Sequence, residues 1–209
     1  MEYILEHIGV SIAAITGVLA ARGKQVDLFG VLVLALVTAF GGGTIRDVLL
    51  GKLPVFWMAD QRYILNASVT AVVMFYLVRY HELPGLVLMV ADAFAMALFT
   101  MIGTRKGVAF PVAPTIAVML GVITGVAGGI LRDLLIGEIP LVFRREIYLY
   151  ATAAFGGAVA FVALTHQDPA NGKWNAILST LVTLLLRLAG IKWRIRLPMF
   201  RPKFTQLEK

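Results

Sequence analysis

Seven apolar segments, each about as long as a membrane-spanning helix, run through this sequence with only short polar breaks between them. They cover residues 4–21, 28–50, 62–79, 85–104, 112–136, 146–165 and 174–190. A helix needs about 20 mostly apolar residues to cross about 30 Å of hydrocarbon. The breaks combine charged residues with Gly or Pro, which is typical of loops at the membrane surface. The pattern predicts an all-α integral membrane protein with seven transmembrane helices.

The composition agrees with lipid as the solvent and narrows the chemistry. Hydrophobic residues make up 59% of the chain and charged residues 15%, with a mean hydropathy of +0.85. Soluble domains carry about 45–50% apolar and about 25% charged residues. There is no cysteine, the three histidines are scattered, and neither a nucleotide-binding loop nor a catalytic triad spacing occurs. We therefore expect no metal centre, no cofactor, no enzymatic activity and no ATP-driven pumping.

An internal duplication with a constant offset of 86 residues links the second and fifth segments. Eight of 22 positions are identical between residues 36–57 and 122–143, with the shared pattern Gly-Gly-x-x-Arg-Asp-x-Leu-x-Gly-x-x-Pro. Each copy holds three segments, an odd number, so the second copy must enter the membrane from the opposite side. We predict two inverted three-helix repeats, residues 1–84 and 85–170, followed by a seventh helix and a basic tail in residues 171–209.

The end of the chain carries most of the net positive charge. From Arg187 to Lys209 there are seven Lys or Arg residues against one Glu. Because Lys and Arg favour the cytoplasmic side, we predict a multi-pass protein of the cell (inner or plasma) membrane with its N-terminus outside and its C-terminus in the cytoplasm. No basic face exists elsewhere, so the tail favours anionic lipid headgroups over nucleic acid. The expected lipid contacts are Lys192, Arg194 and Arg196.

Glycines fall in the middle of both duplicated helices. They are Gly41, Gly42 and Gly43 in the first copy and Gly128 and Gly129 in the second. Each costs a helix about 1 kcal/mol relative to Ala, and broken helices at matching positions indicate a solute pathway near the membrane midplane. We therefore expect broken second and fifth helices. The alternative is that a stripe of small residues lets helix backbones pack closely.

Hydroxyl side chains accompany these glycines and are candidates to line a pore. They are Thr38, Thr44 and Thr124. The alternative for each is a hydrogen bond to a carbonyl of its own helix.

An Arg-Asp pair follows the glycines in each copy, Arg46-Asp47 and Arg132-Asp133. Ionisable residues at membrane depth are costly and usually paired or functional. Neighbours on a helix lie 100° apart, so we expect crossed pairs, Arg46 with Asp133 and Arg132 with Asp47, which clamp the two halves together. Direct contact with a permeating ion is the alternative.

Two acidic residues take equivalent places in the first helix of each copy, Glu6 and Asp92. Asp92 interrupts an otherwise apolar run and should face protein or water. A carboxylate in a vestibule would concentrate cations.

The doubled glycine and Arg-Asp pattern, with Asp92-Ala93 and Phe99 to Gly103, resembles the prokaryotic branch of the trimeric intracellular cation (TRIC) channel family. Related proteins carry names such as glycine transporter or uncharacterised inner-membrane protein. The resemblance covers about residues 5–165. It implies a homotrimer with one pore inside each protomer, lined by the second and fifth helices. It also implies conduction of monovalent cations, chiefly K⁺, with Na⁺ possible.

The resemblance carries roles to particular residues. The five glycines would be kinks, and the two Arg-Asp pairs their charged continuation. Two positions depart from the pattern, because Ala127 stands where the first copy has Gly41, and Glu6 stands where an aspartate is more typical. The alternative function is a secondary transporter for a small solute such as glycine, since broken helices also shape substrate sites.

Overall fold

The computed structural model describes residues 2–81, 83–144 and 149–195, which contain eight α-helices and two short 3₁₀ turns. The α-helices are α1 (Glu2–Ala21), α2 (Leu28–Leu49), α3 (Phe56–Ala59), α4 (Arg62–Tyr80), α5 (Gly85–Val108), α6 (Pro114–Leu135), α7 (Tyr150–Gln167) and α8 (Gly172–Trp193). The 3₁₀ turns are η1 (Leu141–Phe143) and η2 (Pro169–Asn171). The described part of the chain contains no strand, so the all-α class is confirmed.

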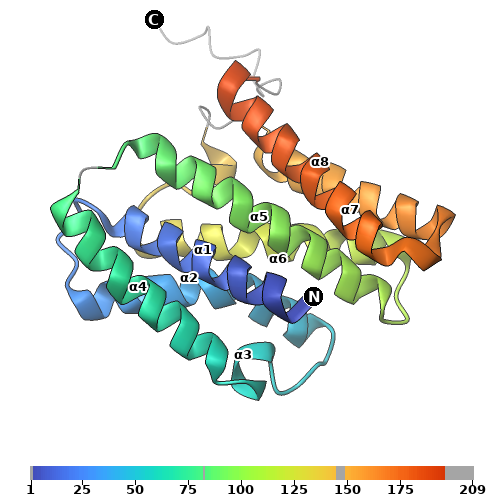
Figure 1. Cartoon of the computed structure of the whole chain (residues 1–209), viewed down its shortest axis with the longest axis horizontal. Coiled ribbons are helices and arrows are strands. Elements are labelled where there is room, and N and C mark those ends of the chain that lie inside the picture. The colour runs from blue at the N-terminus through green and yellow to red at the C-terminus, as the bar shows by residue number, and fades with distance from the viewer. Residues whose placement is uncertain (1, 82, 145–148, 196–209) are drawn as a thin grey trace, which may run out of the picture.

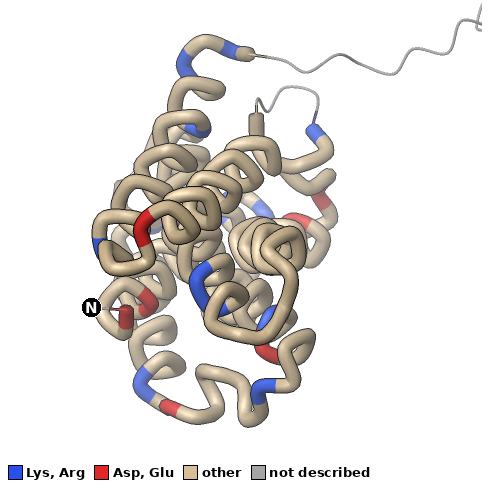
Figure 2. Tube along the Cα trace, turned by 90° about the vertical axis from the view of Figure 1, so that its right-hand side faces the viewer, with Lys and Arg blue, Asp and Glu red and all other residues tan. Residues whose placement is uncertain are grey.

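Six of the described helices are long and apolar enough to cross a membrane: α1, α2, α4, α5, α6 and α8, the last counted from Pro169. Helix α7 occupies the sixth predicted segment but is not among them. Large apolar side chains lie on the outside of these helices, including Phe29 and Leu65. Figure 2 shows long stretches of chain without a charged residue. The molecule is therefore a multi-pass helical membrane protein, whose outer surface suits hydrocarbon.

The helices form two groups that meet at α5 and α6. In Figure 1, α1, α2 and α4 lie on one side, α7 and α8 on the other, and α5 and α6 run between them. Helix α6 packs against both α5 and α2, while α1 packs against α2, α4 and α5. The duplicated helices α2 and α6 are thus direct neighbours in the interior.

The two duplicated helices run without interruption through their glycines. Residues Gly41–Gly43 lie inside α2 and Gly128–Gly129 inside α6, so the prediction of broken helices is wrong. The glycines serve close packing instead. A Cβ built on Gly42 would lie 2.1 Å from the carbonyl oxygen of Thr124, and one on Gly128 would lie 2.3 Å from that of Thr38. Because these contacts are equivalent at the offset of 86, the missing side chains let the two backbones touch at two matched points.

Both duplicated helices also end in the same way. Each passes through one further residue into a glycine with positive φ, Gly51 at 65° and Gly137 at 70°. Glycine adopts this left-handed conformation at low cost. The chain then turns back through a proline into a short helical turn, α3 or η1.

Candidate functional site

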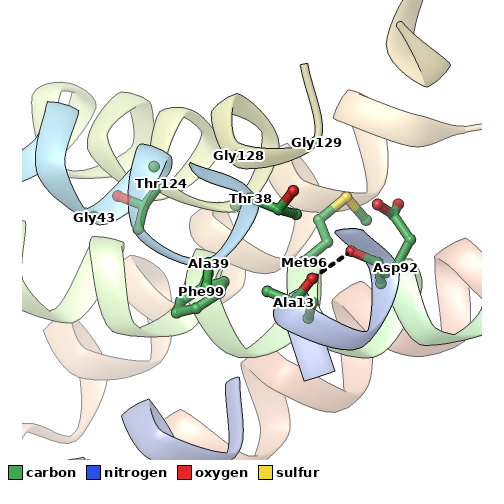
Figure 3. A pocket seen from close by; sticks show the side chains of 14 residues that line it. Ala13, Thr38, Ala39, Gly43, Asp92, Met96, Phe99, Thr124, Gly128 and Gly129 are labelled. Atoms are coloured by element: carbon green, nitrogen blue, oxygen red, sulfur yellow. Dashed lines mark hydrogen bonds between the residues drawn. The ribbon is translucent and has the colours of Figure 1, made fainter. Parts of the chain in front are cut away.

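A small buried cavity lies where α1, α2, α5 and α6 meet (Figure 3). Its volume is about 20 Å³, which is room for about one water molecule. The lining from the duplicated helices is symmetric. It consists of Thr38, Ala39, Gly42 and Gly43 on α2 and, each 86 positions later, Thr124, Gly125, Gly128 and Gly129 on α6. Two copies of one sequence motif therefore build a single cavity.

The lining from α1 and α5 is not symmetric. Helix α1 contributes Ala13 and Thr16, whereas α5 contributes four residues, Asp92, Ala95, Met96 and Phe99. Among the described residues, Asp92 is the sole ionisable side chain in the lining.

The threonine hydroxyls of the cavity bind their own helices. Thr38 Oγ1 donates to the carbonyl of Leu34 at 2.6 Å, and Thr124 Oγ1 donates to that of Leu120 at 2.5 Å. Each hydroxyl oxygen still has lone pairs to offer as an acceptor.

Two of the residues that the sequence assigned to a pore lie outside this lining. Thr44 Oγ1 accepts a hydrogen bond from Trp57 Nε1 at 2.9 Å. Gly41 faces Leu131, whose Cδ1 would lie 2.6 Å from an added Cβ.

Each Arg-Asp pair closes on itself rather than on the other copy. Arg46 Nε donates to Asp47 Oδ1 at 2.8 Å, and Arg132 Nε donates to Asp133 Oδ1 at 2.8 Å. The prediction of crossed pairs is therefore wrong. The Arg side chain is long and flexible enough to reach back across the 100° between neighbouring positions.

The second carboxylate oxygen of each Asp holds the chain that returns after the helix. Asp47 Oδ2 accepts from the backbone N–H of Phe56 at 2.9 Å, and Asp133 Oδ2 accepts from that of Leu141 at 2.8 Å. All four charged side chains are at most 2% exposed. Each pair thus acts as a buried fastener between the end of a helix and the first turn of the next segment.

In the second half, the buried charges extend into a cluster that joins four helices. Arg132 Nη1 donates to Asp92 Oδ1 at 2.9 Å, which links α6 to α5. The Arg187 guanidinium of α8 lies 4.7 Å from the ring centroid of Tyr150 on α7. Gly129 makes room for this cluster, since an added Cβ would lie 2.9 Å from the Tyr150 hydroxyl.

In the first half, the equivalent acid turns toward different partners. Glu6 accepts a hydrogen bond from the Tyr63 hydroxyl at 2.6 Å and forms an ion pair with Lys106 of α5. Arg46 lies over the ring of Phe56, with Cζ 5.7 Å from the centroid. Glu6 therefore does not reach the cavity that Asp92 lines.

Sequence reasoning missed four members of these networks: Tyr63, Tyr150, Lys106 and Arg187. Arg187 was counted with the basic tail, although it lies inside the last apolar segment and is 0% exposed. The two tyrosines lie 87 residues apart, so an alignment without gaps at offset 86 does not pair them.

Two of the three predicted lipid-binding residues lie at the end of α8. Lys192 and Arg194 are exposed, and Lys192 Nζ lies 5.7 Å from the ring centroid of Trp193. Arg196 lies outside the described residues. In the described part of the chain, no group of three or more His, Asp or Glu side chains is placed to hold a metal ion.

The fold and the site together define a multi-pass helical membrane protein with a buried polar cavity at the contact of a duplicated helix pair. Comparison with known proteins identifies the family. The family model described as Glycine transporter matches residues 3–79 and 89–166, two stretches that start 86 residues apart. The UPF0126 inner membrane protein YadS of Escherichia coli (strain K12) is 44% identical over 201 residues, 96% of each chain. A UPF0126 membrane protein of Vibrio cholerae is 42% identical over 95% of this chain and 82% of its own.

Solved structures agree with this result. The TRIC trimeric intracellular cation channel orthologue from Rhodobacter sphaeroides has a TM-score of 0.87 and 38% identity, covering 93% of this chain and 98% of its own. A prokaryotic TRIC channel crystallised in 0.5 M KCl has a TM-score of 0.85 and 29% identity, covering 94% and 98%. The chain belongs to the TRIC channel family, and the resemblance stated from its motifs is confirmed. These structural relatives are channels rather than enzymes, as expected for this chain.

Proposed function

We propose that this protein is a monovalent cation channel whose path runs between α2 and α6 through the buried cavity. The observation that carries the proposal is the symmetric lining, in which four positions of α2 and the same four of α6 meet around one space. The residues there are small, and the threonines Thr38 and Thr124 bring hydroxyl oxygens to the lining. Oxygen atoms of this kind can replace part of the hydration shell of an alkali cation.

The cavity is too small in this conformation for a hydrated ion to pass. It has room for about one water molecule. We take this as the closed state, so opening requires α2 and α6 to separate at the Gly42 and Gly128 contacts.

The proposed arrangement has seven spans in one membrane, with α7 as the sixth. Residues 1–84 and 85–170 form the two inverted repeats, and residues 171–209 hold the last span and the basic tail. Support comes from the matched contacts of Gly42 and Gly128 and from the matched fasteners of Asp47 and Asp133. The proposed orientation has the N-terminus outside and the C-terminus in the cytoplasm, in the inner membrane that the Escherichia coli relative's name specifies.

The proposed assembly is a homotrimer with one path in each protomer. The Rhodobacter sphaeroides orthologue is described as trimeric, and it aligns with 93% of this chain. The proposed permeant is chiefly K⁺, with Na⁺ also conducted, as the resemblance to TRIC channels implies. Among the described residues, the lining contains one acid and no basic side chain, which favours cations over anions.

The test is reconstitution of the purified protein into planar bilayers with unequal KCl concentrations on the two sides. We expect discrete single-channel currents. Their reversal potential should lie close to the equilibrium potential of K⁺ and far from that of Cl⁻. Replacing KCl by NaCl on one side then gives the K⁺ to Na⁺ preference from the reversal potential. Silent bilayers from protein that is folded and trimeric would exclude the channel.

Transport of a small amino acid is the second candidate, and the description of the matching family model favours it. Proteoliposomes that contain no glycine at the start should then take up labelled glycine from outside with saturable kinetics. The lining favours the channel, because among the described residues it offers one acid, Asp92, and no basic side chain that could bind the carboxylate of glycine.

The basic residues Lys192 and Arg194 at the end of α8, together with Arg196 in the following sequence, are proposed to bind anionic lipid headgroups. Each basic residue near such a surface contributes about 1 kcal/mol. Replacing all three by Gln should weaken co-purification of anionic lipid, and an unchanged lipid content would argue against this role.

A further inference from the structure

The two ends of the cavity are chemically different. On α2 and α6 the lining is matched position by position, but on α5 it extends to Asp92, Ala95 and Met96, whose counterparts on α1 do not take part. Those counterparts, 86 positions earlier, are Glu6, Gly9 and Val10. A fold built from two copies of one motif therefore encloses a space with an acid at one end only.

The acid at that end presents a carboxylate oxygen without a hydrogen-bond partner. Asp92 is 5% exposed, and its Oδ1 is held by Arg132 while its Oδ2 has no hydrogen bond. Among the described residues, neither Arg132 nor Arg187 lines the cavity. Asp92 is therefore the member of this charged cluster that lines the space. Figure 3 shows Asp92 at the edge of the lining, on the side of Gly129.

The equivalent acid at the other end, Glu6, does not line the cavity. Glu6 is bound by Tyr63 and Lys106. Both acids are ion-paired, Asp92 with Arg132 and Glu6 with Lys106, but only Asp92 lines the cavity.

We propose that Asp92 makes the conduction path electrically asymmetric by concentrating cations at its own end. This inference rests on the proposed channel function and adds a direction to it. A carboxylate beside a narrow path raises the local cation concentration. Cations entering from the Asp92 end then meet a higher local supply than cations entering from the Glu6 end. With equal salt on both sides, the cation current that starts from the Asp92 end exceeds the reverse current.

The Asp92 end can be identified in an experiment. Asp92 lies in the first third of α5, whose N-terminal end adjoins the loop in which the Leu83 carbonyl contacts Arg22. His81 belongs to the same end and is exposed. Because the chain has no cysteine, His81→Cys gives a single thiol for a membrane-impermeant reagent. The chamber from which that reagent reacts is the Asp92 side.

The test is the current–voltage relation of single channels in symmetric KCl of about 0.1 M, where the screening length is about 10 Å. The protein should pass more cation current from the Asp92 side, by a factor below the about twofold expected for an unpaired unit charge about 8 Å from an ion in water, because Arg132 pairs with Asp92. Asp92→Asn should bring the ratio of the two currents to about one, and Asp92→Glu should keep it above one. Glu6→Gln is the matched control and should keep the direction of the asymmetry.

The outcomes distinguish failure of the proposed channel function from failure of the proposed role of Asp92. Absence of any current from the trimeric protein contradicts the channel itself. Currents that are linear in the unmodified protein, or an Asp92→Asn variant that keeps the parental ratio, overturn the role of Asp92 and leave the channel standing. If Asp92→Asn does not fold, the unmodified protein still decides. Its current ratio should fall toward one in about 1 M KCl, where the screening length is about 3 Å, and an unchanged ratio overturns the proposal.

Discussion

At the scale of single residues, two glycines define how the halves of this protein meet. The backbones of α2 and α6 touch where Gly42 faces the carbonyl of Thr124 and Gly128 faces that of Thr38. Both helices keep their regular structure through these points. The role of the glycines is therefore the absence of a side chain, not an interruption of the helix.

We expect Gly42→Ala and Gly128→Ala to destabilise the protein. The added Cβ would overlap a backbone oxygen, which cannot move aside as a side chain could, and overpacking costs about 1–3 kcal/mol or more. Gly85→Ala is the control, because nothing lies within 4 Å of the Cβ it adds. Thermal unfolding in detergent should show a lower midpoint for the first two variants only. Equal midpoints for all three variants would contradict the packing role.

The Arg-Asp fasteners also make a prediction at this scale. Breaking a buried ion pair by removing one partner costs about 3–5 kcal/mol, because the other charge is left unpaired. We expect Arg46→Gln and Asp47→Asn to show a strong coupling energy in a double-mutant cycle of unfolding free energies. The control cycle combines Arg46→Gln with Asp133→Asn and should be additive, because each residue pairs within its own copy. A strong coupling energy between Arg46 and Asp133 in the control cycle would instead support the crossed pairs.

At the scale of elements, loops from the two halves meet at one end of the molecule. Lys24, which follows α1, forms an ion pair with Glu138, which follows α6, and Arg144 approaches the same carboxylate at 3.3 Å. Arg22 contacts the Leu83 carbonyl between α4 and α5. At the opposite end, the Tyr3 hydroxyl donates to Asp60 at 2.9 Å. Both ends of the helix bundle are therefore tied by polar contacts between segments distant in sequence.

The contact of Lys24 with Glu138 should make stability depend on pH in the acid range. The hydrogen bond and the charge of Lys24 hold the pKa of Glu138 below its ordinary value of 4.5. The stabilisation is therefore present above pH 4.5 and is lost as the pH falls through the lowered pKa. We expect Glu138→Gln to reduce the unfolding midpoint slightly at pH 7 and to match the unmodified protein at the acid end. A difference that persists in acid would show that the charge of Glu138 is not its cause.

The sequence predicted the elements of this fold better than it predicted their contacts. Apolar length placed the long helices within a few residues, because crossing hydrocarbon requires an unbroken run that composition shows directly. The duplicated motifs located the cavity, since Thr38, Gly42, Thr124 and Gly128 all line it. Pairing of charges was not predictable in the same way. The partners of Asp92 and Glu6 come from helices distant in sequence, and helix spacing does not report which way a flexible Arg or Lys side chain turns.

At the scale of the whole molecule, the buried charges are distributed unequally over two similar halves. The second half draws Tyr150 of α7 and Arg187 of α8 into its cluster, whereas the first half recruits Lys106 from α5. Helix α8 lies beyond the two stretches that the family model matches, and it packs against α5 and α7. The buried face of α8, which includes Ser179, Thr183 and Arg187, therefore belongs to the protein interior.

The orientation in the membrane is the prediction that concerns the whole chain at once. Lys and Arg concentrate after α8, so the C-terminus should face the cytoplasm, and the segment between α7 and α8 should face outside. A reporter enzyme that works only in the cytoplasm should be active when it is fused after Lys209. A reporter that works only outside the cytoplasm should be inactive at the same position. In the full chain, Gln167→Cys should react with an impermeant thiol reagent added to intact cells, while His81→Cys should react only after permeabilisation. Both positions are exposed and lie at opposite ends of the helices. The reverse labelling pattern would overturn the orientation, and with it the assignment of Asp92 to the cytoplasmic end of the path, while leaving the asymmetry of the cavity intact.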